Sequence, residues 1–260
     1  MSQGYLLGID IGTYESKGVL VTPAGEVVAS AAVGHSLSLP RPGWAEHDAE
    51  LVWWGDAVTL CRRLLADGAV DPRQILAVGA SAIAPCVLPV DAVGRPLRPA
   101  ILYGIDTRAG EEITLLEREL GRENIFACAA LHLSAQAAGP KILWLREHYP
   151  EIMRRARRFL LLPEYFSYRL TGQAVTDPTI AYSSGFCAED APGYCQAVLA
   201  ATGVSEQQLA RIQPPGTRVG HVRKETAPLW GLSPDTLVVT GTNDQFAGAL
   251  GAGNCHPGIV

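Results

Sequence analysis

The first 33 residues contain three short strand-forming segments in succession, and this arrangement constrains the fold more than any other feature. Tyr5–Ile11 is an apolar run between glycines, and residues 18–21 and 26–33 form two further runs rich in valine and alanine. Pro23, Ala24 and Gly25 provide a turn between the second and the third. Three strands joined by tight turns favour an antiparallel or mixed opening of the sheet over a plain strand–helix–strand start.

Helical and strand-like segments alternate along the rest of the chain. Asp48 is predicted to be the N-cap of a helix, because apolar residues follow it at helical spacing as far as Leu65. Further helices are expected at 108–120, 141–148, 152–159, 164–170, 195–202, 206–211 and 246–250, strands at 75–80, 86–90 and 236–240, and loop or irregular strand over 171–193. The pattern predicts an α/β protein without internal repeats.

Composition and charge exclude several classes of protein. Apolar residues make up 48% of the chain and charged residues 18%, enough for a substantial core and too apolar for a disordered chain. Lys and Arg number 21 against 26 Asp and Glu, a net charge of −5, which argues against nucleic-acid and anionic-membrane partners. The long uncharged run 74–90 is broken by Gly79, Pro85 and Pro89, so no membrane span is expected.

The cysteines and the N-terminus indicate an intracellular protein. Six cysteines are scattered without a CxxC pair, which gives no zinc-site spacing and predicts reduced thiols. Asp10 interrupts the N-terminal apolar run before a signal-peptide core forms. We therefore expect a soluble cytoplasmic protein. The basic run Arg154, Arg155, Arg157 and Arg158 is expected to form the solvated face of one helix.

The segment from Asp10 to Lys17 is the first candidate site. A strand ends on Asp10, Gly12 and Thr13 form a tight turn, and Lys17 lies in the returning strand. Gly12 allows backbone N–H groups to approach an anion, while the Thr13 hydroxyl and the Lys17 ammonium can donate to phosphate oxygens. Asp10 could hold Mg²⁺, which prefers carboxylates and water. The segment is neither a Walker A loop nor GxGxxG, and a plain β-hairpin with a solvated lysine is the alternative.

Asp244 and its neighbours form the second candidate. Gly241-Thr-Asn-Asp-Gln245 follows a buried strand and opens a helix of small residues, at the edge of an open sheet where ligand crevices form. A carboxylate there could accept the proton of a substrate hydroxyl during phosphoryl transfer. The alternative is that Asn243 or Asp244 is an ordinary helix N-cap.

A third candidate, Tyr103-Gly-Ile-Asp106-Thr-Arg108, places an acid and a base at the start of a helix. Asp106 and Arg108 could bind sugar hydroxyls. Alternatively, they could be only a capping motif with an arginine on the helix surface, and their spacing does not distinguish these two interpretations. The histidines have no metal-ligand spacing and are expected in the core or on the surface; they are His35, His47, His132, His148, His221 and His256.

Taken in order, these motifs resemble the N-terminal domain of the FGGY family of carbohydrate kinases, in its xylulokinase-like branch. The D-x-G-T-x-x-S-K element at Asp10–Lys17 is similar to the family's opening phosphate motif. Further similar elements follow in register: Gly43–Asp48 with Trp53-Trp54, Arg98–Leu102 leading into Asp106–Arg108, Pro140–Trp144, Leu170–Gly172 with Thr176-Asp177, and Gly241–Gln245 with Gly248–Gly253.

The resemblance implies a ribonuclease H-like, actin-type ATPase fold with sugar and ATP in a cleft between two domains. It implies that Asp244 is the general base and that Asp10 positions Mg²⁺ and the transferred phosphate. It places Gly12, Thr13, Ser16 and Lys17 at the phosphates of ATP, and Asp106, Arg108 and Gln245 at the substrate. Such roles suit a reaction catalysed mostly by positioning and charge neutralisation.

Two departures from the family pattern bear on the substrate. Xylulokinases carry a Gln-Met-His-Gly stretch that contacts the sugar, and its place is taken here by Ile83-Ala-Pro-Cys86, so D-xylulose itself is not carried over. The usual Asn after the catalytic Asp is replaced by Gln245. The acceptor is expected to be a pentulose or a related small sugar or polyol.

The chain is also expected to be one part of the family's two-domain architecture. Residues 1–253 correspond to the sugar-binding domain, and 254–260 look like the start of a C-terminal domain or a strand that closes a sheet. Because the family's ATP-adenosine site lies mostly in that C-terminal domain, the 260 residues alone are expected to be inactive. A homodimer is compatible with the resemblance. The alternatives are a non-catalytic sugar sensor and an actin- or chaperone-like ATPase.

Overall fold

A mixed seven-stranded sheet forms the centre of the molecule. The structure is a computed structural model that describes residues 4–129, 131–187, 193–254 and 256. The strand order is β11-β12-β5-β1-β2-β3, with β13 also pairing with β5. The strands are β1 (Tyr5–Ile11), β2 (Glu15–Val21), β3 (Val27–Gly34), β5 (Ile75–Ala82), β11 (Arg218–His221), β12 (Leu237–Val239) and β13 (Thr242–Asn243). β1, β2 and β3 are antiparallel, as the opening segments predict, whereas β5 runs parallel to β1 and β12.

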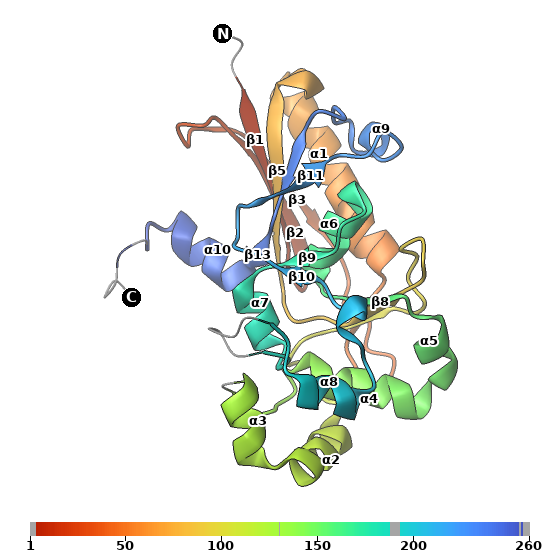
Figure 1. Cartoon of the computed structure of the whole chain (residues 1–260). Helices are drawn as coiled ribbons and strands as arrows, with labels where there is room; N and C mark the ends of the chain where they lie inside the picture. Colours follow the sequence, from red (N-terminus) through yellow and green to blue (C-terminus); the bar gives the residue numbers. More distant parts are fainter. Residues whose placement is uncertain (1–3, 130, 188–192, 255, 257–260) are drawn as a thin grey trace.

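One face of the sheet is covered and the other is open. Because side chains alternate along a strand, Leu7, Ile9 and Ile11 of β1 are buried on one face while Gly8 and Asp10 lie on the other. The covered face packs against α1 (Gly55–Asp67) and α6 (Leu162–Thr171). On the opposite side of the sheet α10 (Asp244–Gly251) projects outward (Figure 1) and has no buried residue.

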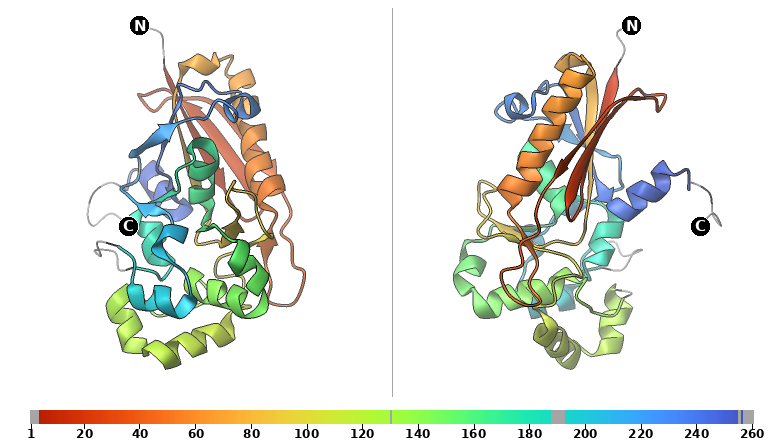
Figure 2. Two further views of the ribbon diagram at one scale, coloured as in Figure 1. Left: turned by 45° about the vertical axis from the view of Figure 1, so that its right-hand side comes forward. Right: turned by 180° about the vertical axis from the view of Figure 1, so that it is seen from behind.

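A second, mainly helical region lies at the end of the molecule away from the N-terminus, as the two further views show (Figure 2). It contains α2 (Gly110–Leu120), α3 (Arg122–Ala129), α4 (Ala138–His148), α5 (Pro150–Arg155) and α8 (Gln196–Thr202). Two further helices are α7 (Pro178–Ser183) and α9 (Ala227–Trp230), and Pro72–Gln74 forms a 3₁₀ turn before β5. Short strand pairs are β4 (Glu46–His47) with β7 (Ala100–Ile101), β6 (Leu88–Val90) with β8 (Arg158–Leu160), and β9 (Val175–Thr176) with β10 (Arg211–Ile212).

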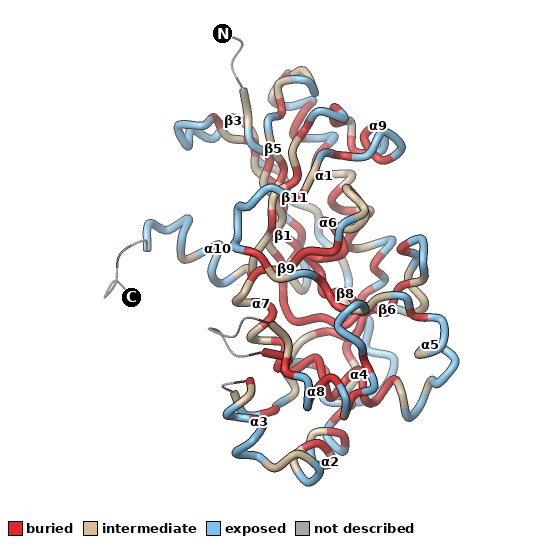
Figure 3. Tube along the Cα trace, in the orientation of Figure 1, coloured by how far each residue is buried: buried red, intermediate tan, exposed pale blue. Residues whose placement is uncertain are grey.

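Buried residues are concentrated where the sheet meets the helices (Figure 3). The indole of Trp54 lies 5.2 Å from that of Trp230 and stacks on Phe166 of α6. Asp48 caps the helical segment that begins at Ala49, accepting bonds from the N–H groups of Glu50 and Leu51, so the predicted N-cap is confirmed. The first turns of that segment, Ala49–Trp54, are π-helical and continue directly into α1.

Several predicted elements differ from the structure. The helix expected over 152–159 ends at Arg155, and Arg158 belongs to strand β8, where its guanidinium donates to the carbonyls of Gln207 and Leu209. The basic run is therefore not one helix face. The helix expected over 206–211 is a single 3₁₀ turn, Glu206–Gln208, followed by β10. Tertiary pairing overrides local helix propensity at both places. The strand expected over 254–260 lies mostly outside the described residues.

Two cysteines are disulfide-bonded, which corrects the prediction that all thiols are reduced. Cys128 of α3 and Cys195, just before α8, are bonded with a Cα–Cα distance of 5.9 Å. This spacing lies within the range that a disulfide requires, and sequence spacing could not reveal it because 67 residues separate the two. Cys61, Cys86 and Cys187 are free and buried, and Cys255 lies outside the described residues.

Candidate functional site

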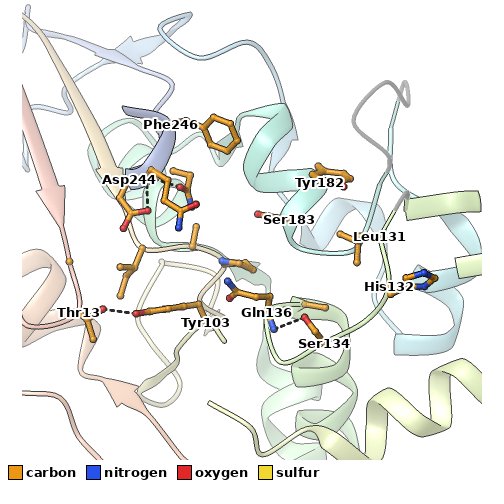
Figure 4. Close-up of a pocket in the computed structure, with 17 residues that line it drawn as sticks. Thr13, Tyr103, Leu131, His132, Ser134, Gln136, Tyr182, Ser183, Asp244 and Phe246 are labelled. Atoms are coloured by element: carbon orange, nitrogen blue, oxygen red, sulfur yellow. Dashed lines mark hydrogen bonds between the residues drawn. The ribbon is translucent and has the colours of Figure 1, made fainter. Parts of the chain in front are cut away.

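A cavity of about 450 Å³ lies between the edge of the sheet and the helical region (Figure 4). We call it the main pocket. It is lined by Gly12, Thr13, Ile83, Ala84, Pro85, Tyr103, Leu131, His132, Ser134, Gln136, Ala137, Tyr182, Ser183, Asn243, Asp244, Gln245 and Phe246. The first and second candidate motifs, more than 200 residues apart in sequence, therefore meet at one cavity.

Asn243 and Asp244 have separate positions at the start of α10. Asn243 is the N-cap, and its side-chain oxygen accepts the N–H of Gln245 at 2.8 Å. Asp244 is the first helical residue; its Oδ1 also accepts the Gln245 N–H at 2.8 Å, and its carboxylate lines the main pocket. Because Asn243 supplies the cap, Asp244 is not needed for that purpose.

The pKa of Asp244 is raised. Partial burial is the larger cause, and the negative charge of Asp10 adds to it, against the stabilising hydrogen bond from Gln245 N–H. A raised pKa makes a carboxylate a better proton acceptor.

Gly12 and Thr13 form the turn between β1 and β2. The N–H of Gly12 donates to the carbonyl of Glu15 at 3.0 Å, and a Cβ at Gly12 would lie only 2.7 Å from that carbonyl oxygen. Gly12 therefore shapes the turn rather than offering its own N–H to an anion. The hydroxyls of Thr13 and Tyr103 are hydrogen-bonded to each other at 2.8 Å at the edge of the main pocket (Figure 4).

Asp10 and Lys17 lie on the open face of the sheet, in a second cavity of about 630 Å³ that also contacts Leu250 of α10. We call it the open-face cavity. Oδ1 of Asp10 accepts a bond from the Ser81 hydroxyl at 2.7 Å. Lys17 pairs with Glu15 at 3.4 Å, and 63% of its side chain is exposed, so the ammonium is accessible to a ligand. The same strand register places Asp10 opposite both Lys17 and Ser81.

Asp106 and Arg108, predicted as substrate residues, do not line either cavity. The Arg108 guanidinium donates to both carboxylate oxygens of Asp106 and, at 2.8 Å, to Glu46, and no part of the Arg108 or Asp106 side chain is exposed. The guanidinium carbon Cζ of Arg108 lies over the ring of Trp44, 3.9 Å from the ring centroid. These charges therefore satisfy one another in the core.

The side chain of Ser16 points away from the face of the sheet that carries Asp10 and Lys17. Strand alternation turns it to the covered face, where its hydroxyl donates to Asp56 of α1 at 2.7 Å. Its side chain is fully buried, so it contacts the core instead of a phosphate. Gln245, in contrast, lines the main pocket beside Asp244.

Several pocket residues were not singled out from the sequence. Gln136, Ser134 and Tyr182 bring polar groups into the main pocket, and Lys141 lies buried behind it. Isolated polar residues between helices carry no motif of their own. The Pro140–Trp144 element was the one available signal, since a lysine on an otherwise apolar helix needs a buried partner.

The stretch Ile83-Ala84-Pro85 forms an apolar wall of the main pocket. No three His, Cys, Asp or Glu side chains gather into a metal-binding cluster in the described part of the chain. Within the same residues no helix combines the length and apolar character needed to cross a bilayer.

Comparison with known proteins identifies the family. Residues 5–251 match the model of the FGGY family of carbohydrate kinases, N-terminal domain. The chain belongs to this family. Its fold is that of the mixed α/β, actin-like N-terminal domain of FGGY kinases.

Individual relatives agree with this assignment. The chain is 32% identical over 247 residues to xylulose kinase from Escherichia coli (strain K12), and the match covers 95% of this chain and 50% of that protein. It is 27% identical over 258 residues to autoinducer-2 kinase from Salmonella choleraesuis (strain SC-B67), and the match covers 97% of this chain and 48% of that protein. It matches the crystal structure of xylulose kinase from Rhodospirillum rubrum with a TM-score of 0.91 at 29% identity, and the match covers 98% of this chain and 52% of that chain. The chain thus spans about half the length of the relatives it matches.

Proposed function

We propose that this chain is the sugar-binding part of a kinase that transfers the γ-phosphoryl group of ATP to a hydroxyl of a small sugar or polyol. The observation that carries the proposal is the position of Asp244, whose carboxylate lines the main pocket opposite the Gly12-Thr13 turn. The pocket is large enough for a pentulose or related acceptor, and its polar groups suit hydroxyls. FGGY membership and xylulose kinase relatives support the same class of acceptor.

Asp244 is proposed as the general base. A carboxylate that accepts one backbone N–H bond retains further lone pairs for a substrate hydroxyl. Its raised pKa favours removal of the hydroxyl proton as the oxygen attacks phosphorus. Gln245 is proposed to bind a neighbouring hydroxyl, and Thr13 and Lys17 to donate to phosphate oxygens from the two sides of the β1–β2 turn.

Asp10 has the donor chemistry that Mg²⁺ requires. It offers carboxylate oxygens on the open face, one of them fixed by Ser81, and Mg²⁺ in nucleotide sites commonly takes one or two carboxylates together with water and phosphate oxygens. When bound, the ion would neutralise phosphate charge. Asp244 lines the main pocket and Asp10 lines the open-face cavity, so the acceptor would bind in the first and the metal-bound phosphates would approach from the second.

A non-catalytic sugar sensor is the second candidate. The apolar wall Ile83–Pro85 favours it, because the sugar-contacting stretch expected from the family is replaced. Asp10, Thr13 and Asp244 favour the kinase, since a binding protein needs neither a proton acceptor nor a magnesium carboxylate.

ADP release with a panel of acceptors tests the proposal. The 260-residue chain and, if the reading frame extends past Val260, the intact protein are assayed with xylulose, ribulose, fuculose, gluconate, glycerol and erythritol, with Asp244→Asn alongside. We expect acceptor-dependent turnover by the intact protein that falls by about 100-fold or more in Asp244→Asn, and little by the 260-residue chain. Binding without turnover would support the sensor. Turnover unchanged in Asp244→Asn would show that another residue is the base.

A further inference from the structure

Lys141 is a buried cation behind the main pocket that the proposed reaction does not use. It lies on α4 with 1% of its surface exposed. Its Nζ donates to the carbonyl of Tyr103 at 3.0 Å and to the carbonyl of Ala135 at 2.6 Å. A buried ammonium is costly unless it is hydrogen-bonded, so these two carbonyls fix its position and it fixes theirs.

The two carbonyls belong to residues that directly precede Gly104 and Gln136. The N–H of Gly104 donates to Oε1 of Gln136 at 2.6 Å, so a second bond joins the same two segments. A Cβ at Gly104 would lie 2.9 Å from both Cδ and Oε1 of Gln136. The absence of a side chain at position 104 therefore makes room for the Gln136 amide.

This arrangement determines which polar group Gln136 presents. Because a backbone N–H requires an oxygen, the carbonyl end of the Gln136 amide is used and the donor nitrogen is its other polar end. Gln136 lines the main pocket next to Tyr103, with Asp244 across from them (Figure 4). The Ile83–Pro85 wall offers no side-chain donor, so hydrogen bonds to an acceptor molecule must come from other walls of the pocket.

We propose that Lys141 is a positioning residue that holds Tyr103 and Gln136 in the main pocket, with the Gln136 amide nitrogen donating to an oxygen of the acceptor. The proposal rests on the proposed function and concerns how the same pocket selects its substrate. Lys141 acts through the two backbone carbonyls and does not contact the acceptor.

The charges around Lys141 give its role a pH signature. Cys86, Asp106 and Arg108 are the titratable or charged groups that face it; the Asp106 carboxylate favours the ammonium and the Arg108 guanidinium opposes it. Burial outweighs them and lowers the pKa of Lys141 to about 8. Burial also raises the pKa of the Cys86 thiol to about 12, so Cys86 stays neutral while Lys141 titrates. Above pH 8 a neutral amine holds the two carbonyls less strongly.

Kinetics of the intact reading frame between pH 6.5 and 9.5 test the proposal, using the best acceptor of the panel. For the unaltered protein, KM for the acceptor should rise several-fold above pH 8 with little change in kcat. Lys141→Met should raise KM about 10-fold and abolish that pH dependence. Lys141→Arg keeps the charge and should give a KM that is flat to pH 9.5.

Two further variants test the proposal without a substitution at the buried position 141. Gln136→Leu removes the donor, and Gly104→Ala displaces the Gln136 amide at a backbone position that tolerates alanine, because its φ is not in the left-handed region. Each should raise KM about 3- to 10-fold. One deoxy analogue, which lacks the oxygen that Gln136 contacts, should have a higher KM than the acceptor with the unaltered protein. With Gln136→Leu, the KM values of this analogue and of the acceptor should be equal. Gln207→Leu, an exposed glutamine outside the main pocket, is the matched control and should change nothing.

The outcomes separate the inference from the function. KM and its pH profile unchanged in Lys141→Met, or a lower melting temperature with unchanged KM, would overturn the positioning role. Unchanged KM in both Gln136→Leu and Gly104→Ala would overturn it too, even if Lys141→Met does not fold. Absence of turnover and binding with every acceptor would instead overturn the proposed function, and the inference with it.

Discussion

His47 donates a hydrogen bond from Nε2 to the backbone carbonyl of Thr13 at 3.1 Å. The indole N–H of Trp53 donates to Nδ1 of the same ring at 3.2 Å, so Nδ1 is the acceptor and Nε2 carries the proton. Burial, together with the neighbouring His35, lowers the pKa of His47 to about 4. A neutral imidazole therefore fixes the turn that carries Thr13 throughout the physiological pH range.

Replacing His47 should impair phosphate positioning in the intact enzyme. His47→Ala leaves the Thr13 carbonyl without its donor, and we expect kcat to fall about 3- to 10-fold, in line with the loss of one buried hydrogen bond. His47→Gln keeps an N–H donor of similar reach and should retain most of the activity. Steady-state kinetics with ATP as the varied substrate measure both. Equal activities of the two variants would show that the hydrogen bond has no part in the reaction.

Glu164 should make the protein less stable as pH rises. It is buried, its Oε2 accepts the N–H of Leu161 at 2.8 Å, and burial raises its pKa to about 7. An unfolded Glu has a pKa of about 4.3, so between these values the folded state binds more protons than the unfolded state. The free energy of unfolding therefore falls as pH rises through this window.

Urea unfolding of Glu164→Gln from pH 4 to 8 checks this sign. The amide oxygen still accepts the Leu161 N–H, and the titrating group is gone. The variant should match the unaltered protein near pH 4 and be more stable by about 3–4 kcal/mol at pH 8, since the folded and unfolded pKa values differ by about 2.7 units and each unit is worth about 1.4 kcal/mol. A stability difference that does not depend on pH would contradict the raised pKa.

Arg108→Met should destabilise the fold without a selective effect on the acceptor. It leaves Asp106 and Glu46 buried without the guanidinium that pairs with both, and breaking such a buried pair costs about 3–5 kcal/mol. Urea unfolding measures the loss. Arg73→Met is the control, because its pair with Asp71 lies on the surface and should contribute nothing measurable. A stable Arg108→Met protein with a specific rise in acceptor KM would restore the predicted substrate role.

Ser16→Ala should weaken stability and spare phosphate binding. The hydroxyl bonds Asp56 in the core, and leaving a buried carboxylate with one donor fewer costs about 1–3 kcal/mol. Thr13→Val is the comparison, since it removes the hydroxyl that lines the main pocket. ATP KM should rise in Thr13→Val alone. A rise of similar size in Ser16→Ala would place Ser16 at the phosphates after all.

The sequence predicted the elements that its local signals define. The β1–β3 hairpins, the Asp48 cap and the helix after Asn243 follow from strand-forming runs, turns and capping residues within a few positions of each other. The meeting of Gly12-Thr13 with Asp244 was implied by the family resemblance, and the structure brings them to one pocket.

Features that depend on partners distant in sequence could not be predicted. Asp106 and Arg108 have the composition of a sugar site, and only the fold shows that Glu46 and Trp44 enclose them. The strand at Arg158–Leu160 forms because β6 pairs with it, against a local pattern that favours helix. Lys141 gives no local sign that its partners are the carbonyls of Tyr103 and Ala135.

The order of strands in the central sheet has a consequence for how the chain folds during synthesis. β1 pairs early with β2, its neighbour in sequence. β5 begins at Ile75, about 40 residues after β3 ends at Gly34, and its other neighbour, β12, is complete only at Val239. Until that point one edge of β5 has no strand beside it. Pairings of such long sequence separation form slowly, so the nascent chain depends on its early hairpins and α1 to shield β5 from association with other chains.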